Sequence, residues 1–432
     1  MHIRLILRVV LAGLLVSAAS GCATYAYKFQ PIERALVARQ PDVALTALDK
    51  AYSPSGVDAP LYYLNQGMLL RLNKRYAESN AALEKAKKLI DAVEAISVTE
   101  HTSSVIVNDT VRSYEGEDFE KVLLHLYKAL NYLDLQQPYE ARVEVLQVDV
   151  KIRELNSGSS GAALTEEAFA RYLNGIIFEN LGEWSDAMIE YRKAYEAFGL
   201  YKKKYNVALP ESLKYALLRL AERQGLNDDL KTYREEFKIT DAPSVASREA
   251  NGELVVTLHS GLVALKGEVA SQALDPSSGR FIRIALPVYH PRAVQVTQAR
   301  LRVGEQTVRL DLVEDVSALA IKSLESHMAA ITARTVARAA VKYRAAKEAE
   351  KRNAGAGLLM NIAGVISEQA DTRSWSSLPA QIQLGRVSLA PGTYKAQLEL
   401  LDNSGKLVHT QDFGNVSITQ GKATYLAFHW TS

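Results

Sequence analysis

The stretch RYLNGIIFENLGEWSDAMIEYRKA, residues 171–194, decides the fold of the first half of the chain. In it Gly175 is followed by a Gly-Glu-Trp turn, and then Ala187, Tyr191 and Ala194 recur at helical spacing. This pattern is typical of a tetratricopeptide (TPR) repeat, a unit of about 34 residues in which two antiparallel helices pack through small residues. It predicts one helix on each side of the turn, with their backbones in close contact.

Other parts of the first half repeat these offsets. One copy has Gly67, Leu70, Ser79, Leu83 and Ala86, and another has Ala129, Tyr132, Ala141, Val145 and Val148. An irregular helical bundle is the alternative, but three copies with shared offsets favour the repeat. Between the copies we expect a loop at 156–163 and a non-helical stretch at 92–118. Such arrays present a concave face that holds peptides or helices, so we expect a protein partner there.

After residue 251 the sequence changes to short β-branched, alternating runs, which indicate a β-sandwich. The runs are 253–258, 281–288, 294–303, 306–312, 380–389, 392–401, 406–411, 414–419 and 423–429. A long helix at 315–352 interrupts them, and an apolar, glycine-rich stretch at 353–366 follows it. The expected fold class is therefore α+β and multidomain, with an all-α TPR-like repeat before an interrupted β-sandwich.

The interrupting segment has three interpretations. Its later part is basic, so the helix either lies on anionic lipid or pairs with a partner. Alternatively it packs over the sheet with its charges in water. The glycine-rich stretch is too short to cross a bilayer, but it offers a second contact with a membrane.

The domain boundaries follow from these patterns. We expect a signal peptide at 1–21, a helical repeat domain at 22–238, a linker at 239–251, and a β-sandwich domain at 252–432 with its helical insertion at about 315–366.

The N-terminus has the features of a bacterial lipoprotein signal. Arg4 and Arg8 precede a short apolar stretch, and the small residues Ala19-Ser20-Gly21 precede Cys22, the only cysteine of the chain. Resemblance to such signals implies cleavage before Cys22 and acylation of its thiol, with more than one acyl chain for stable anchoring. A plain signal peptide or an uncleaved anchor is the alternative. Ala23 stands where Asp commonly retains lipoproteins at the inner membrane, which favours the periplasmic face of the outer membrane.

Charge argues against nucleic acid as a ligand. The whole chain has 51 Lys and Arg and 49 Asp and Glu, and loss of Arg4 and Arg8 with the signal leaves 49 of each. Nucleic acid requires a basic face, which a formally neutral chain lacks. With Cys22 acylated no thiol is left for a disulfide, so a hydrophobic core must supply the stability.

No catalytic residue, cofactor site or metal site is predicted. Gly355-Ala356-Gly357 follows no strand and is not a nucleotide fingerprint, and the histidines share no metal-ligand spacing. Asp109, Glu115, Glu117, Asp118 and Glu120 form an acidic cluster around Tyr114. The cluster lacks the arrangement of an EF-hand, so we interpret it as solvated charge.

Several short segments occur in a characteristic order. They are Val107-Asn108-Asp109, Tyr114-Glu115-Gly116 with Glu120, residues 124–133 (LHLYKALNYL), residues 334–347, residues 371–375 (DTRSW), Leu378-Pro379 and Pro391-Gly392-Thr393-Tyr394. In this order they resemble a family of poorly characterised bacterial TPR-containing lipoproteins. The resemblance implies an envelope protein without known catalysis, associated with small outer-membrane lipoproteins such as a penicillin-binding-protein-activator type. Partner contacts are predicted at Tyr114, Glu117, Glu120, Tyr132 and Trp375.

The expected function is that of an outer-membrane-anchored periplasmic scaffold or adaptor in cell-envelope assembly. One alternative is an envelope enzyme acting on peptidoglycan or glycans through Glu117 or Glu120. Another is an oligomerising, membrane-associated component that uses the segment 317–366.

Overall fold

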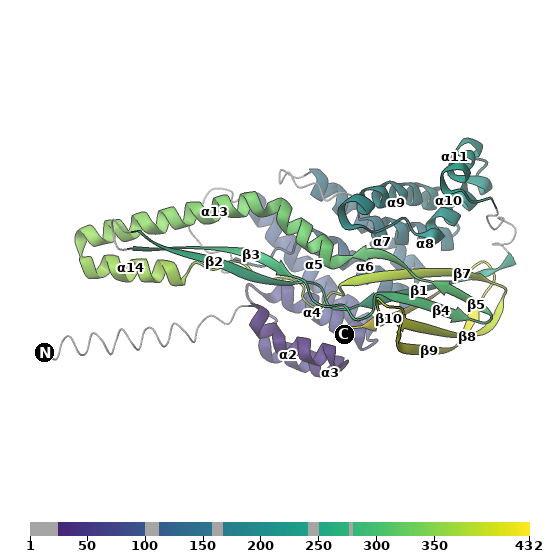
Figure 1. Ribbon diagram of the computed structural model, residues 1–432, viewed down its shortest axis with the longest axis horizontal. Coiled ribbons are helices and arrows are strands. Elements are labelled where there is room, and N and C mark those ends of the chain that lie inside the picture. The colour runs from purple at the N-terminus through teal and green to yellow at the C-terminus, as the bar shows by residue number, and fades with distance from the viewer. Residues whose placement is uncertain (1–24, 100–111, 158–166, 241–249, 276–279) are drawn as a thin grey trace.

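The structure, a computed structural model, describes residues 25–99, 112–157, 167–240, 250–275 and 280–432. In the first half, consecutive helices within these ranges pack as antiparallel hairpins (Figure 1). The helices are Tyr25–Val37 (α2), Pro41–Ala51 (α3), Ala59–Leu72 (α4), Tyr76–Thr99 (α5), Asp118–Asp134 (α6), Pro138–Ser157 (α7), Ala168–Asn180 (α8), Trp184–Tyr205 (α9), Glu211–Arg223 (α10) and Asn227–Phe237 (α11).

The small residues of the repeat lie where the hairpin helices touch. A β-carbon on Gly67 of α4 would lie 2.6 Å from the side chain of Leu83 of α5, and one on Gly175 of α8 would overlap the ring of Tyr191 of α9. Ala187 and Ala194 are completely buried in the same contact. The TPR-like packing predicted from the sequence offsets is therefore confirmed.

Replacing Gly175 by alanine is expected to lower the free energy of unfolding by about 1–3 kcal/mol, because the added methyl group forces Tyr191 out of its packed position. Gly199 is the matched control, since it lies inside α9 and a β-carbon there meets nothing within 4 Å. Gly199→Ala should stabilise the protein by about 0.5–1 kcal/mol. Equal midpoints for the two variants in urea denaturation would contradict the predicted close packing.

The second half forms two four-stranded sheets and a separate hairpin (Figure 1). One sheet has the order β10-β1-β7-β6, the other has the order β5-β4-β8-β9, and β2 pairs with β3 alone. Leu254, Leu301, Val387 and Leu398 belong to the apolar core between the two sheets, as a sandwich requires. The strands are Gly252–Ser260 (β1), Leu265–Asp275 (β2), Arg280–His290 (β3), Gln298–Val303 (β4), Gln306–Arg309 (β5), Asp311–Asp315 (β6), Gln381–Leu389 (β7), Gly392–Leu401 (β8), Leu407–Ile418 (β9) and Ala423–Trp430 (β10).

The predicted long helix is confirmed as Val316–Arg352 (α13), and the glycine-rich stretch after it folds as a second helix, Ala354–Ile366 (α14). The two helices pack side by side, and together with the β2–β3 hairpin they form an arm that projects from the rest of the molecule (Figure 1). None of the helices in the described ranges is long and apolar enough to span a membrane.

Three expectations about elements were wrong. Strand β2 was not predicted, because its Gly, Ala, Ser and Gln residues weaken the alternation. Helix α5 continues to Thr99, although a break was expected from residue 92. The runs 406–411 and 414–419 form one strand, β9, because Gly414 takes a positive φ of 70° and absorbs an irregularity in the pairing with β8. The run expected to be extended at 105–107 lies outside the described residues, as does most of the loop at 156–163.

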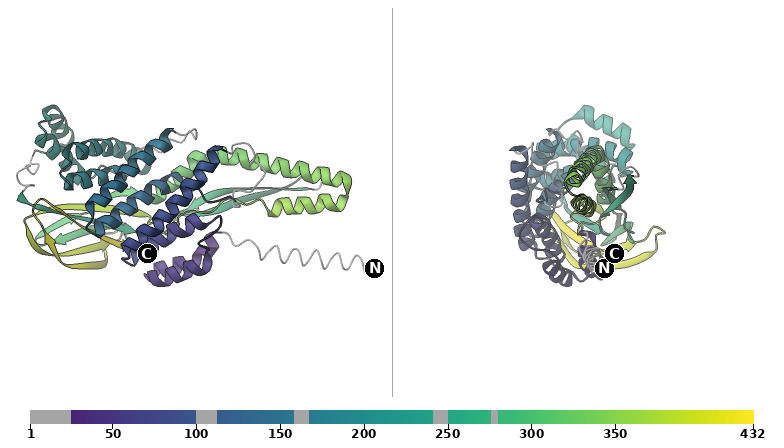
Figure 2. Two further views of the ribbon diagram at one scale, coloured as in Figure 1. Left: turned by 180° about the vertical axis from the view of Figure 1, so that it is seen from behind. Right: turned by 90° about the vertical axis from the view of Figure 1, so that its left-hand side faces the viewer.

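The inner face of the helical array is filled by the chain itself. Helices α6 and α8, the first helices of their hairpins, contact the β10-β1-β7-β6 sheet (Figure 2). In α8, 12 of the 13 residues are buried, against 8 of 22 in α9. Residues from α4, α6, α8 and this sheet share one hydrophobic core. The expected open concave face for a partner is therefore corrected, because the sheet takes the place of the ligand.

A buried charge cluster joins the array to the sheet. Arg386 of β7 donates to Glu179 of α8 at 2.9 Å and to both oxygens of Glu253 of β1 at 2.8 and 3.0 Å. It also donates to the hydroxyl of Tyr191, which in turn donates to Glu179 at 2.6 Å. Arg219 of α10 pairs with the other oxygen of Glu179. Because these side chains come from both halves of the chain, the cluster fixes how the array sits on the sheet.

The two ends of the described chain are also tied together. Thr431 and Ser432, directly after β10, donate hydrogen bonds to the carbonyl oxygens of Leu36 and Val37 at the end of α2. The guanidinium of Arg39 lies 4.5 Å from the centre of the Trp430 ring. The first helical hairpin is thus held in place by the last residues of the protein.

Candidate functional site

Four of the five predicted contact residues meet where the arm joins the body. Glu117 is the N-cap of α6 and forms a capping box with Glu120 in the first turn. The Glu120 carboxylate also accepts from the hydroxyl of Tyr114 at 2.6 Å and from the backbone N–H of Trp375 at 2.7 Å. The helix cap thereby becomes a link to the segment that follows α14, about 255 residues further along the chain.

Burial changes the chemistry of this cluster. The side chain of Glu120 is 1% exposed, and its removal from water raises its pKa to about 7, helped by the neighbouring negative charge of Glu117. The hydrogen bonds from Tyr114 and Trp375 oppose that rise. Glu117 itself pairs with Lys266 of β2, so each carboxylate of the cluster has a partner within the chain.

The exposures correct part of the predicted contact set. Trp375 has no exposed surface, and Tyr114 and Glu120 are also buried, so these three cannot touch a partner in this conformation. Their bonds hold the arm to the array instead. Tyr132 is half-buried and lies about 18 Å further along α6, away from the cluster. Cys22, the predicted acylation site, lies outside the described residues.

A polar cleft of about 250 Å³ opens beside the cluster. Its walls are the 112–118 segment, the middle of α13, the base of the β2–β3 hairpin, and the residues after α14. Positive and negative side chains line it in similar numbers, namely Arg112, Lys266, Arg334, Arg338 and Arg373 against Glu115, Glu117, Asp118 and Asp371.

Most of these charges are paired across the cleft walls. Arg373 binds Asp371 at 2.7 Å and Asp58 of the array at 3.1 Å, and it donates to the carbonyl oxygen of Arg112 at 2.9 Å. The pKa of Asp371 is held below its ordinary value, because the hydrogen bond and charge of Arg373 outweigh burial. This arrangement neutralises charge at a joint between two parts of the fold.

The cleft lacks the geometry of a glycosidase. That chemistry needs two carboxyl groups facing one substrate bond. Glu117 lines the cleft, but Glu120 lies beneath it with its oxygens bonded to Tyr114, Glu117 and Trp375. In the part of the chain that the structure covers, no group of three or more His, Cys, Asp or Glu side chains is arranged to hold a metal ion.

Glu120→Gln should change how stability depends on pH. The folded-state pKa of about 7 lies above the ordinary 4.5, so the folded protein binds more protons than the unfolded chain between these values. The contribution of Glu120 to stability is therefore lost as pH rises through 7. Relative to wild type, the variant should gain roughly 2–3 kcal/mol between pH 5 and pH 8 in urea unfolding. Glu222→Gln, at an exposed position of α10, should give a flat difference, and a flat curve for Glu120→Gln would refute the assignment.

An unpredicted surface lies on the outside of the array. On α7 the side chains of Tyr139, Val143, Leu146 and Val150 follow the i, i+4, i+7, i+11 spacing of one helix face, and they are 69, 55, 41 and 38% exposed. We call these four residues the α7 stripe. A soluble helix normally turns such a stripe inward. Helix α7 buries a different stripe, with Ala141, Val145 and Val148, as the repeat offsets predict.

A groove of about 340 Å³ runs beside the α7 stripe, between α7 and α5. Val150 lies at its edge, and charged side chains line the rest, among them Lys87, Asp91, Glu94, Lys151 and Glu154. Lys151 bridges the two helices through Glu94 at 3.3 Å. The outer face thus combines an apolar row with a charged border of both signs.

Comparisons with known proteins yield only partial likenesses. No family model and no curated protein matches the chain. Among solved structures, apo RapI is 14% identical over 50% of this chain and 54% of its own, with a TM-score of 0.35. MamA (41-end) from Desulfovibrio magneticus RS-1 is 15% identical over 49% of this chain and 89% of its own, with a TM-score of 0.29. A tetratricopeptide repeat protein from Parabacteroides merdae ATCC 43184 is 12% identical over 49% of this chain and 66% of its own, with a TM-score of 0.31. The chain covers about half the length of RapI, and its TPR-like assignment is carried by the hairpin contacts described above.

Proposed function

We propose that this protein is a non-catalytic scaffold of the bacterial envelope. It is anchored through Cys22 to the periplasmic face of the outer membrane, and it holds an amphipathic helix of an envelope protein against the α7 stripe. The proposal rests on one observation. The inner face of the array is occupied by the chain's own sheet, whereas the outer face exposes four apolar side chains in register on α7.

The shape and charge of the outer face suit a helix. A row at i, i+4, i+7 and i+11 extends over about 17 Å, which is three turns of a facing helix. The groove beside it offers Lys87 and Lys151 together with Asp91, Glu94 and Glu154 to the charged flank of the same helix. Small outer-membrane lipoproteins are the proposed class of partner, on the basis of the family resemblance.

The enzyme alternative has less support. It would require Glu117 or Glu120 as a general acid or base, and Glu120 is sealed under the cleft with both oxygens hydrogen-bonded. Glu117 is engaged by Lys266. An array that uses its inner face for its own sheet and leaves an apolar row outside is better suited to assembly than to turnover.

A photoreactive amino acid in place of Leu146 is expected to give one discrete adduct in living cells. Tyr139→Asp with Val143→Asp should abolish that adduct, because two charges interrupt the apolar row. Leu407 of β9 is 53% exposed and serves as the matched control position, where no such adduct should form. In the Tyr139→Asp, Val143→Asp background, which forms no adduct, Cys22→Ser should move the protein from the membrane fraction to the soluble fraction, because no anchored partner then holds it at the membrane. Equal adducts at Leu146 and Leu407 would disprove the docking surface, and an unchanged membrane fraction would disprove the anchor.

A further inference from the structure

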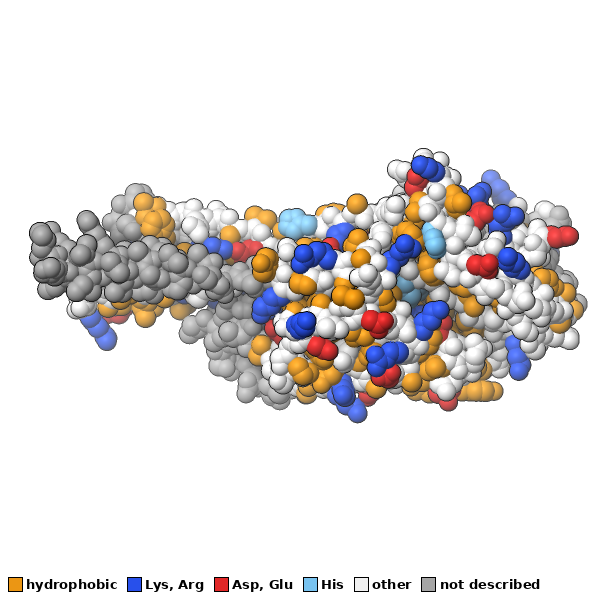
Figure 3. All heavy atoms as spheres, turned by 90° about the horizontal axis from the view of Figure 1, so that it is seen from below, with side chains coloured by type: hydrophobic (Ala, Val, Ile, Leu, Met, Phe, Trp, Pro, Cys, Tyr) orange, Lys and Arg blue, Asp and Glu red, His pale blue; other side chains and the backbone are white. Residues whose placement is uncertain are grey.

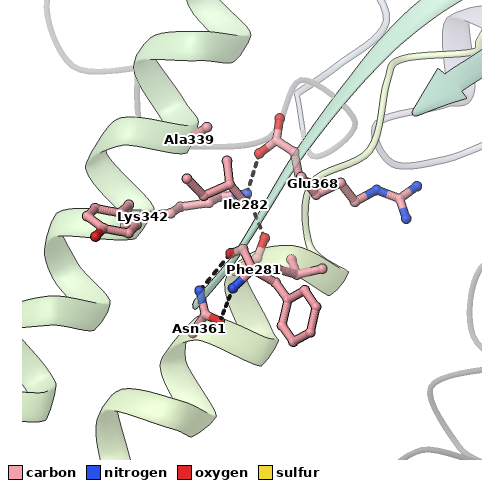
Figure 4. Close-up of a pocket in the computed structure, with 10 residues that line it drawn as sticks. Phe281, Ile282, Ala339, Lys342, Asn361 and Glu368 are labelled. Atoms are coloured by element: carbon pink, nitrogen blue, oxygen red, sulfur yellow. Dashed lines mark hydrogen bonds and ion pairs between the residues drawn. The ribbon is translucent and has the colours of Figure 1, made fainter. Parts of the chain in front are cut away.

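Hydrogen bonds, an ion pair and close helix packing hold the parts of the arm together. Figure 4 shows how Asn361 of α14 pairs with the backbone of Phe281 in β3, accepting from its N–H at 3.0 Å and donating to its carbonyl at 2.9 Å. Lys342 of α13 binds Glu368 at 2.6 Å. A β-carbon on Gly357 would lie 2.5 Å from the side chain of Glu350, so α14 packs closely on α13. The face of α14 that carries Gly357 and Asn361 is therefore buried against the rest of the arm.

The outer face of α14 has no such partners within the described chain. Leu358 and Leu359 are each 57% exposed, Met360 is 47% exposed, and Ile366 is 44% exposed. The helix contains no charged residue. Near the end of the β2–β3 hairpin, Phe281 is a further large apolar side chain with about half of its surface in water. Large exposed apolar side chains gathered on one helix in this way mark an interaction site.

Positive charge accompanies this apolar surface. Between residues 334 and 352, α13 carries seven Lys and Arg and two Glu. The last four basic residues of α13 are all exposed, namely Arg344, Lys347, Lys351 and Arg352. An apolar helix beside a basic one is the pattern of elements that lie in the interface of an anionic bilayer.

The start of α2 restricts where a membrane can lie. Tyr25 is buried in the body and follows Cys22 by three residues, a reach of about 10 Å at most. Helix α2 lies at the end of the body from which the arm projects, and α14 lies on the same side of the arm as α2 (Figure 1). Glu33 of α2 pairs with Arg292 just after β3, so the two parts are joined. Seen from that side, the body shows apolar side chains interspersed with basic and acidic ones (Figure 3).

We infer that the arm is a second membrane contact, in which the outer face of α14 lies in the interface of an anionic lipid bilayer beside the acyl anchor. This inference rests on the proposed lipid anchor. A short tether at α2 and an apolar α14 on the same side place the arm along the lipid surface. At 13 residues, or about 20 Å, α14 rests on the bilayer and does not cross its core of about 30 Å.

Charge favours lipid over a second copy of the chain. Two arms packed through α14 would bring two basic α13 helices together, which like charges oppose. Acidic headgroups complement the same residues. The orientation fixed in this way turns the α7 stripe into a surface at a defined height above the membrane.

A single introduced cysteine tests the arm, because Cys22 is the only natural cysteine and its sulfur is acylated in the proposed mature protein. The acylated full-length mature protein with Leu359→Cys is labelled with a nitrobenzoxadiazole dye and reconstituted in vesicles of phosphatidylethanolamine and phosphatidylglycerol. The dye should shift to the blue and lose most of its emission when brominated lipids are included. A dye at Lys231→Cys on α11, an exposed position distant from the arm, should show neither effect.

The outcomes separate the arm from the anchor. Flotation with vesicles but no quenching at residue 359 would overturn the arm contact and leave the anchor standing. Failure to float would overturn the proposed anchor. A blue shift that grows with protein concentration, without quenching by brominated lipid, would assign α14 to a second copy and overturn the inference. Leu358→Asp with Ile366→Cys labelling should abolish quenching, whereas Leu407→Asp in the same background should not.

Discussion

Replacing Arg386 by alanine is expected to lower the free energy of unfolding by about 3–5 kcal/mol, because it removes the positive charge that two buried carboxylates share. The guanidinium bonds Glu179, Glu253 and Tyr191, all of which are buried. Arg219 still reaches Glu179 in the variant, but Glu253 loses both of its bonds to Arg386. Urea denaturation followed by tryptophan fluorescence and by circular dichroism measures the loss.

The same experiment reports whether the halves unfold together. The cluster joins α8, α9 and α10 to β1 and β7, so its removal should separate the transitions of helix and sheet. Arg302→Ala is the control, since Arg302 makes an exposed pair with Glu399 at 3.1 Å and should cost at most about 1 kcal/mol. Similar midpoints for the two variants would show that the buried cluster does not stabilise the joint.

Trp375→Ala is the second large effect, with an expected loss of about 3–5 kcal/mol from an unfilled cavity. The indole is completely buried and lies edge-on to Tyr127, with ring centres 6.0 Å apart. Its N–H has no hydrogen-bond partner in the described structure, so Trp375→Phe loses packing alone and should cost about 1–2 kcal/mol.

Trp375→Ala also distinguishes a structural role of Trp375 from a role in contacting a partner. A structural role predicts a lower denaturation midpoint, while the Leu146 adduct persists under conditions where the variant is folded. A partner-contact role predicts an unchanged midpoint and a missing adduct. The second result would support the predicted partner contact at Trp375, although the side chain is buried in this structure.

The sequence predicted the local packing well, because its signals lie close together in the chain. Gly175 and Tyr191 are 16 positions apart, and their offset alone indicates that the two helices touch. The long helix at 315–352 was equally predictable from the spacing of its apolar residues. Strand β2 was missed, since much of it is exposed and its residues need no alternation.

Contacts between the two halves of the chain could not be predicted from the sequence. Arg386 looks like any polar residue of a half-exposed strand, yet its partner Glu179 lies 207 residues away. One feature of the sequence could have predicted that the inner face of the helical array is covered. Helix α8 is apolar around almost its whole circumference, which is typical of a helix covered on all sides. The α7 stripe was visible too, as a second apolar row beside the one assigned to packing.

The bonds from Thr431 and Ser432 to the end of α2 have a consequence for biogenesis. Synthesis runs from the N-terminus, so the helices emerge before the strands that cover them. The final strand, β10, pairs with β1 and forms one edge of the sheet that lies against the array. Until residues 423–430 are made, the edge strand of this sheet is missing, so the part of the apolar array face that β10 covers, beside α6, stays open for a chaperone to bind.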